Sequence, residues 1–142
     1  MARALFIEAE HDLNTAKLTK DGGEFSKTIQ HSCDAVEKAA KAFLTLDGHG
    51  IIPQHKVSDF MSELLNKYPK VRMKLTKVVK HMNYLEDFSG KTKYPIRIRG
   101  KLIIPSEQFN EKEAENCLKL ANEVMDQIVE LAEEIFKINL VK

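Results

Sequence analysis

The sequence predicts an all-α protein, an up-and-down bundle of four main helices plus one short helix, with a basic extended loop or small hairpin before the last helix. Two observations support this class. Apolar residues recur at steps of three and four over most of the 142 residues. Glycine and proline are scarce, at 6 and 4 residues, and they fall between these periodic stretches. The length fits one domain over residues 1–142, because single domains most often hold about 100–150 residues.

The first two helices are expected at residues 2–19 and 24–46. Asp21-Gly22-Gly23 interrupts the first, and glycines at 48 and 50 end the second, since glycine accepts the left-handed conformation that closes a helix. The second helix has a long apolar face, which comprises Phe25, Ile29, Cys33, Val36, Ala40, Phe43 and Leu44.

Three further helices complete the predicted bundle. A short one is expected at 57–68, and Pro69 opens the next at 70–88, because proline is tolerated at a helix start. The last begins at Asn110, with Glu113 three residues later as in a capping box, and its helical period continues towards the end of the chain.

The segment 94–105 breaks the helical pattern. Ile96 and Ile98 alternate with Arg97 and Arg99, which is the period of a strand, and Gly100 supplies a turn. We therefore expect an extended segment or a small hairpin. An isolated two-stranded hairpin is marginally stable, so it should lie against the bundle.

Composition excludes several classes of protein. Apolar residues make up 43% and charged residues 30%, which excludes a disordered or collagen-like chain. No apolar run reaches the ~20 residues of a membrane helix, and acidic residues follow the start too soon for a signal peptide. The two cysteines, Cys33 and Cys117, form no disulfide pattern. These features predict a soluble, cytoplasmic protein.

The net charge of +1 hides an uneven distribution of charge. Residues 1–55 carry −2, residues 56–101 carry +8 and residues 102–142 carry −5. The basic middle predicts a surface that attracts anions, although a solvated lysine-rich face without a partner would give the same count.

Candidate phosphate-binding residues lie in 91–101, which contains no acid. They are Lys91, Lys93, Tyr94, Arg97, Arg99 and Lys101, in which the cations suit phosphate and the tyrosine suits base stacking. Lys74, Lys77 and His81 recur on one stripe of the preceding helix and are candidates for the rim of a groove. Solubilising lysines would produce the same stripe.

Neither a metal site nor a catalytic motif stands out. The five histidines form no His-x-x-His or His-x-x-x-His pair, and both cysteines lie on apolar helical faces, so no metal and no cofactor are expected. No P-loop, Gly-x-Ser-x-Gly or His-Glu-x-x-His motif is present. On the second helix, the spacing predicts that Asp34 pairs with Lys38 and Glu37 with Lys41, with a polar cluster facing a groove as the alternative.

The order of several motifs resembles the HEPN domain family. The run from Gln30 to Leu44 contains Ala35-Val36-Glu37-Lys38 and Lys41-Ala42, followed by glycines and then His55 before a short helix. Lys93-Tyr94-Pro95 resembles the Arg-Tyr-Pro segment that follows the family's fourth helix, with lysine in place of arginine. The resemblance covers nearly the whole chain.

This resemblance implies a helical bundle that forms a homodimer, binds a nucleotide or RNA and works with a minimal nucleotidyltransferase in a toxin–antitoxin-like pair. Some members are metal-independent ribonucleases that use an arginine and a histidine separated by four to six residues. Here eight residues separate Arg72 from His81 and seven separate Arg3 from His11, so the sequence favours binding over cleavage. A ribonuclease that uses His81 or His55 as general base and a pure protein-interaction module remain the alternatives.

Overall fold

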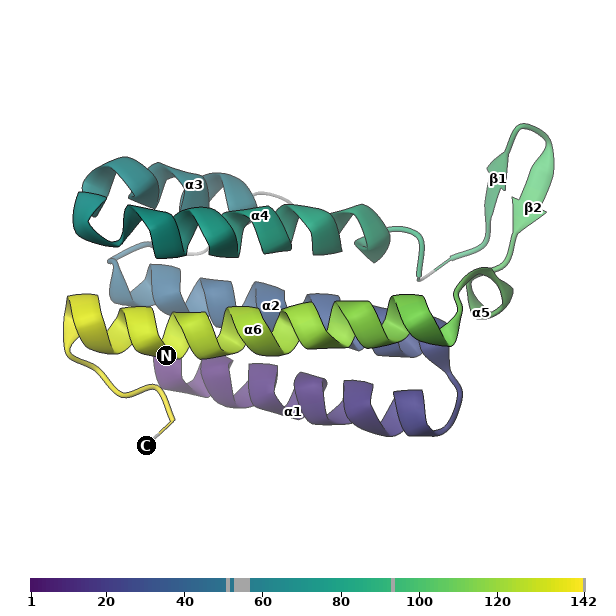
Figure 1. Cartoon of the computed structure of the whole chain (residues 1–142), viewed down its shortest axis with the longest axis horizontal. Helices are drawn as coiled ribbons and strands as arrows, with labels where there is room; N and C mark the ends of the chain where they lie inside the picture. Colours follow the sequence, from purple (N-terminus) through teal and green to yellow (C-terminus); the bar gives the residue numbers. More distant parts are fainter. Residues whose placement is uncertain (51, 53–56, 93, 142) are drawn as a thin grey trace.

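The computed structural model describes residues 1–50, 52, 57–92 and 94–141. The predicted all-α class is confirmed (Figure 1). The elements are α1 (Ala2–Asp21), α2 (Phe25–Leu46), α3 (Val57–Lys67), the 3-10 turn η2 (Pro69–Val71), α4 (Arg72–Ser89), β1 (Ile96–Ile98), β2 (Lys101–Ile103), α5 (Pro105–Gln108) and α6 (Glu111–Phe136). The four-residue α5 was not anticipated.

The four long helices run side by side along the long axis of the molecule, and α3 lies beside α4 (Figure 1). Helix α2 is central and contacts α1, α3, α4 and α6. Its predicted apolar face is largely buried, with Ile29, Phe43 and Leu44 fully inside the core. Leu75 of α4 and Ile128 of α6 are also fully buried, so the 3.6-residue period places one face of each helix in a common core.

The last helix begins as the sequence predicts. The side chain of Asn110 accepts a hydrogen bond from the Glu113 backbone N–H at 2.8 Å, and Glu113 Oε1 accepts one from the Asn110 backbone N–H at 3.2 Å. The helix ends at Phe136 because Lys137 adopts a left-handed conformation with φ of 57°. The chain then turns back along the bundle, where Leu140 is buried and Arg3 donates to the carbonyl oxygen of Asn139 at 3.0 Å.

The predicted hairpin is present. Strands β1 and β2 are antiparallel, with Ile96 opposite Ile103 and Ile98 opposite Lys101. Arg99 and Gly100 both have positive φ, at 51° and 78°, as a two-residue hairpin turn requires.

The expectation that this hairpin lies against the bundle is wrong. It projects beyond the end of the bundle above α5 (Figure 1), and Ile98 and Leu102 are 48% and 51% exposed. The reason is local: Pro105 and Phe109 are buried and fix the chain where it returns to α6, which leaves the strands outside the core. None of the helices described here is long and apolar enough to cross a membrane.

Candidate functional site

The residues predicted to bind phosphate lie in the connection between α4 and α5, which we call the basic segment (residues 91–101). Lys91 follows the end of α4, and Arg97, Arg99 and Lys101 lie on the hairpin; all four are exposed. Tyr94 is 71% exposed at the foot of the hairpin. Lys93 lies outside the described residues.

The cations of the basic segment have no acidic partner among the residues that the structure describes. Arg97 donates only to a backbone carbonyl oxygen, that of Gly100, at 3.3 Å. An exposed cation without an ion pair keeps its full attraction for an anion from solution. The segment therefore has the charge and accessibility that a phosphate site needs.

The candidate stripe on α4 (Lys74, Lys77 and His81) differs from the basic segment, because two of its residues have acidic neighbours. Lys74 Nζ lies 3.1 Å from Glu134 Oε2 of α6, and this hydrogen bond raises the pKa of Lys74. His81 Nδ1 lies 3.8 Å from Glu123 Oε2, and burial lowers the pKa of His81 although Glu123 opposes this. Lys77 is exposed. Two of the three stripe residues thus face acids of α6, and the charge of Lys74 is offset by Glu134.

Lys74, the first residue of the stripe, lies well away from the basic segment. Lys74 lies near the start of α4 and the hairpin follows its end (Figure 1). Fifteen residues of helix separate Lys74 from Ser89, which is about 22 Å at 1.5 Å per residue. The role of the stripe as a groove rim stays a prediction.

Charged residues of α2 form an ion pair within the helix and another with α1. Glu37 and Lys41 pair at 3.4 Å as the spacing predicts. Lys38 instead bonds Asp12 of α1 at 2.7 Å, and this bond, with a smaller contribution from Asp34, raises the pKa of Lys38. Lys38 thus forms a bond between helices across the α1–α2 interface, and its predicted pairing with Asp34 stays a prediction.

The Glu86 carboxyl group of α4 lies in a second polar contact, with α3. Ser58 of α3 donates to Glu86 Oε2 at 2.9 Å. Burial raises the pKa of Glu86, and the charges of Asp59 and Glu37 add to the effect. The hydrogen bond links α3 and α4, and Glu37 of α2 acts on Glu86 through its charge; a polar cluster facing a groove stays a prediction. The described residues contain no group of three or more metal-ligating side chains.

A second polar cluster joins the end of α2 to the end of α3, and we call it the Asp47 cluster. Asp47 is 2% exposed at its side chain. Its Oδ1 accepts hydrogen bonds from the Tyr68 hydroxyl and from Lys67 Nζ at 2.9 Å, and its Oδ2 lies 3.2 Å from His49 Nε2. Burial alone would raise the pKa of Asp47, but the bonds from Tyr68 and Lys67 lower it. Through these bonds the cluster joins the end of α2 to the end of α3.

Comparison with known proteins agrees with the architecture. A family model for the HEPN domain matches residues 2–137, which is nearly the whole chain. The chain belongs to the HEPN domain family. A relative from Methanocaldococcus jannaschii, named "Putative toxin MJ1304", is 32% identical over 144 residues, which cover 92% of this chain and 88% of the relative. No solved structure matches the chain.

The arginine and histidine of the HEPN ribonuclease motif are not brought together by the described residues. Arg72 and His81 are nine residues apart on α4, which separates them by about 13 Å and half a turn. Arg72 donates to Asn66 and His81 faces Glu123, so the two side chains lie on different sides of the helix. His55, the alternative base, lies outside the described residues.

Proposed function

We propose that this HEPN protein binds the phosphates of a nucleotide or of RNA through the basic segment. The observation that carries the proposal is the set of exposed cations without acidic partners on a projecting hairpin. The binding residues are Lys91, Lys93, Tyr94, Arg97, Arg99 and Lys101. Elsewhere on the molecule, the lysines that line the two described hollows are paired with carboxylates, Lys74 with Glu134 and Lys41 with Glu37.

Each residue type has a distinct task in this proposal. The lysines and arginines neutralise phosphate and release condensed counterions, so affinity falls as salt rises. The exposed ring of Tyr94 stacks on a base. Pro95 fixes the backbone angle where the chain enters β1.

We infer further that the protein acts as the toxin-like member of a pair with a minimal nucleotidyltransferase, as a cytoplasmic homodimer. The name of the relative from M. jannaschii and membership of the HEPN family support the toxin-like role. Cys33 and Cys117 are buried and form no disulfide, which is consistent with a reducing compartment.

A gel experiment tests the binding proposal. Purified protein is incubated with end-labelled single-stranded RNA at low and high salt and then run on native and denaturing gels. We expect a salt-sensitive shift without cleavage, and a weaker shift for Arg97→Ala/Arg99→Ala. Lys17→Ala/Lys119→Ala is the matched control, because it removes the same charge from exposed sites outside the basic segment.

Two results would contradict the proposal. An unchanged shift for the double arginine variant would exclude the hairpin as the binding site. The absence of any shift with wild-type protein would favour a protein partner, to be sought by capture with a nucleotidyltransferase subunit. Cleavage on the denaturing gel that is lost in His81→Ala would instead identify a ribonuclease.

A further inference from the structure

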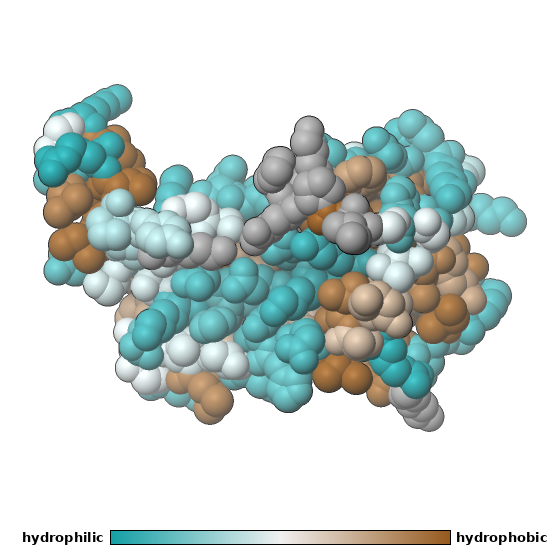
Figure 2. Space-filling model, turned by 180° about the vertical axis from the view of Figure 1, so that it is seen from behind, coloured by the Kyte–Doolittle hydropathy of each residue, from teal (hydrophilic) through white to brown (hydrophobic). Residues whose placement is uncertain are grey.

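The hairpin has two unlike faces. Side chains alternate across a strand, and opposite residues share a face. The register therefore places Ile96, Ile98, Lys101 and Ile103 on one face, which we call the isoleucine face, and Arg97 and Leu102 on the other. Space-filling Figure 2 shows apolar side chains gathered on this projecting arm.

No helix of the described chain packs extensively against the hairpin. Two strands alone are marginally stable in water, and each strand here has one unpaired edge. Ile98 remains 48% exposed. An arm of this kind gains stability when another surface covers its apolar face.

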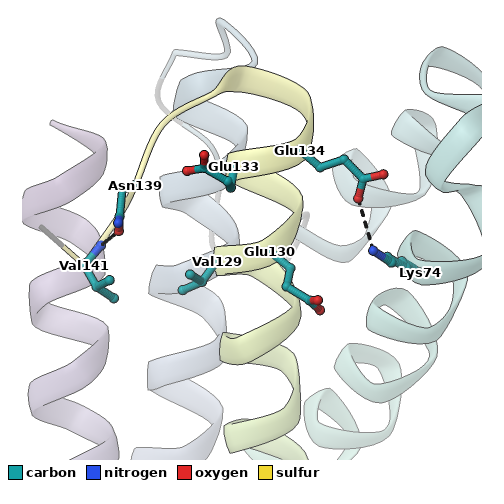
Figure 3. Close-up of a pocket in the computed structure, with 7 residues that line it drawn as sticks. All are labelled: Lys74, Val129, Glu130, Glu133, Glu134, Asn139 and Val141. Carbon is teal, nitrogen blue, oxygen red and sulfur yellow. Dashed lines mark hydrogen bonds and ion pairs between the residues drawn. The ribbon is translucent and has the colours of Figure 1, made fainter.

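A surface with matching properties lies at the other end of the molecule. A hollow of about 460 Å³ is formed by the last turns of α6, the chain tail and α4 (Figure 3). It is lined by Lys74, Val129, Glu130, Glu133, Glu134, Asn139 and Val141. Val129 and Val141 supply apolar contact between α6 and the tail, and Val141 is 53% exposed.

The charges of the two surfaces are complementary. From Glu123 to Phe136 the sequence of α6 has five acids and no base. The end of a helix already carries a partial negative charge, so these carboxylates favour a cationic partner. The hairpin, residues 96–103, has three bases and no acid.

The hairpin of a chain cannot fill the hollow of the same chain. The hairpin precedes the start of α6, whereas Val129 to Glu134 of the hollow lie 18 to 23 residues after Glu111, which is about 27–35 Å along the helix. A second copy that lies antiparallel beside the first brings each hairpin to the other's hollow. The exchange is reciprocal and closes as a two-fold dimer.

We propose that the isoleucine face of one copy docks over Val129 and Val141 of a second copy. Lys101 and the turn residue Arg99 then lie beside the carboxylates of Glu130 and Glu133. Arg97 and Tyr94 stay available to solvent in this dimer, whereas Arg99 and Lys101, which the proposed function also assigns to phosphate, are shared between the two roles.

Sedimentation or light scattering of the full chain over a range of concentrations tests the dimer. Ile98→Asp should shift the wild-type dimer to monomer, with at least a tenfold weaker association. Leu102→Asp is the matched control, because it puts the same charge on the opposite face of the same hairpin and should leave the dimer intact. A monomeric wild type, or a dimer equally resistant to both substitutions, would overturn the proposal.

Charge-swap variants and cross-linking test which residues of the two copies lie together. Lys101→Glu and Glu133→Lys should each weaken the dimer, and combining them in one chain should restore it. A mixture of Ile98→Cys and Val141→Cys chains should form a disulfide-linked pair on oxidation, since Cys33 and Cys117 are buried. A failure of both the rescue and the cross-link would refute this docking. RNA binding by Ile98→Asp, measured in parallel, separates the dimer from the proposed function.

Discussion

Removal of the Asp47 carboxylate should destabilise the fold strongly, because this group joins the end of α2 to the end of α3. In Asp47→Ala the Tyr68 hydroxyl and the His49 ring lose their acceptor in a half-buried site. Lys67 returns to water, since its amine is exposed, and its bond adds little.

The magnitude follows from the two remaining hydrogen bonds. A hydrogen bond to a charged group contributes about 1.5–3 kcal/mol. Because the two bonds share one carboxylate and the site relaxes, we expect a loss of about 3 kcal/mol in the free energy of unfolding. For a chain of this size, that lowers Tm by about 9 °C at about 3 °C per kcal/mol.

The stability that Asp47 contributes should also depend on pH, which gives a second test of its role. The folded state lowers the pKa of Asp47, so the stabilisation is complete above the ordinary aspartate pKa of about 3.9. It is lost as the pH falls below that value towards the folded-state pKa. The difference in stability between wild type and Asp47→Ala should therefore shrink in acid.

Thermal unfolding followed by circular dichroism at pH 7 and at lower pH measures both effects. Asp21→Ala is the control, because Asp21 is exposed at the end of α1 and forms no ion pair among the described residues. A loss for Asp47→Ala below about 1 kcal/mol, or a difference that does not change with pH, would refute the assignment of a buried, ionised carboxylate.

Two further substitutions test the helix cap and the polar cluster. Asn110→Ala should cost about 1 kcal/mol of stability through the lost capping box, whereas Asn110→Asp should retain it; chemical denaturation distinguishes them, and equal losses would contradict the cap. Glu86→Gln should stabilise the fold slightly at neutral pH, because burial raises the pKa of Glu86 and so penalises its ionised form. This gain should vanish as the pH falls below the ordinary glutamate pKa of about 4.3, and a loss of stability at pH 7 would show that the charge is needed.

The sequence predicted the helices well because their evidence is local. Periodic apolar residues and a cap such as Asn110 act within a few turns of chain, so the predicted ends agree with the structure to within about two residues. The hairpin was predicted from the alternation of Ile96 and Ile98 with the arginines. Its projection from the bundle was not predicted, because it follows from the burial of Pro105 and Phe109, and the alternation within the strands gives no signal for that packing.

The contacts between helices could not be predicted from spacing. Lys38 and Asp12 are 26 positions apart, and Ser58 and Glu86 are 28 apart. For the candidate site, composition alone identified the basic segment. The partners of Lys74 and His81 depend on how α4 and α6 pack, and the sequence has no signal for them over such distances.

The salt dependence of RNA binding tests the central proposal most directly. Fluorescence anisotropy with labelled single-stranded RNA, repeated over several salt concentrations, gives the slope of log affinity against log salt. Arg97→Ala/Arg99→Ala should reduce this slope by about 1.4, because each lost phosphate contact on a single strand removes about 0.7. A wild-type slope and affinity in this variant would contradict phosphate binding by the hairpin.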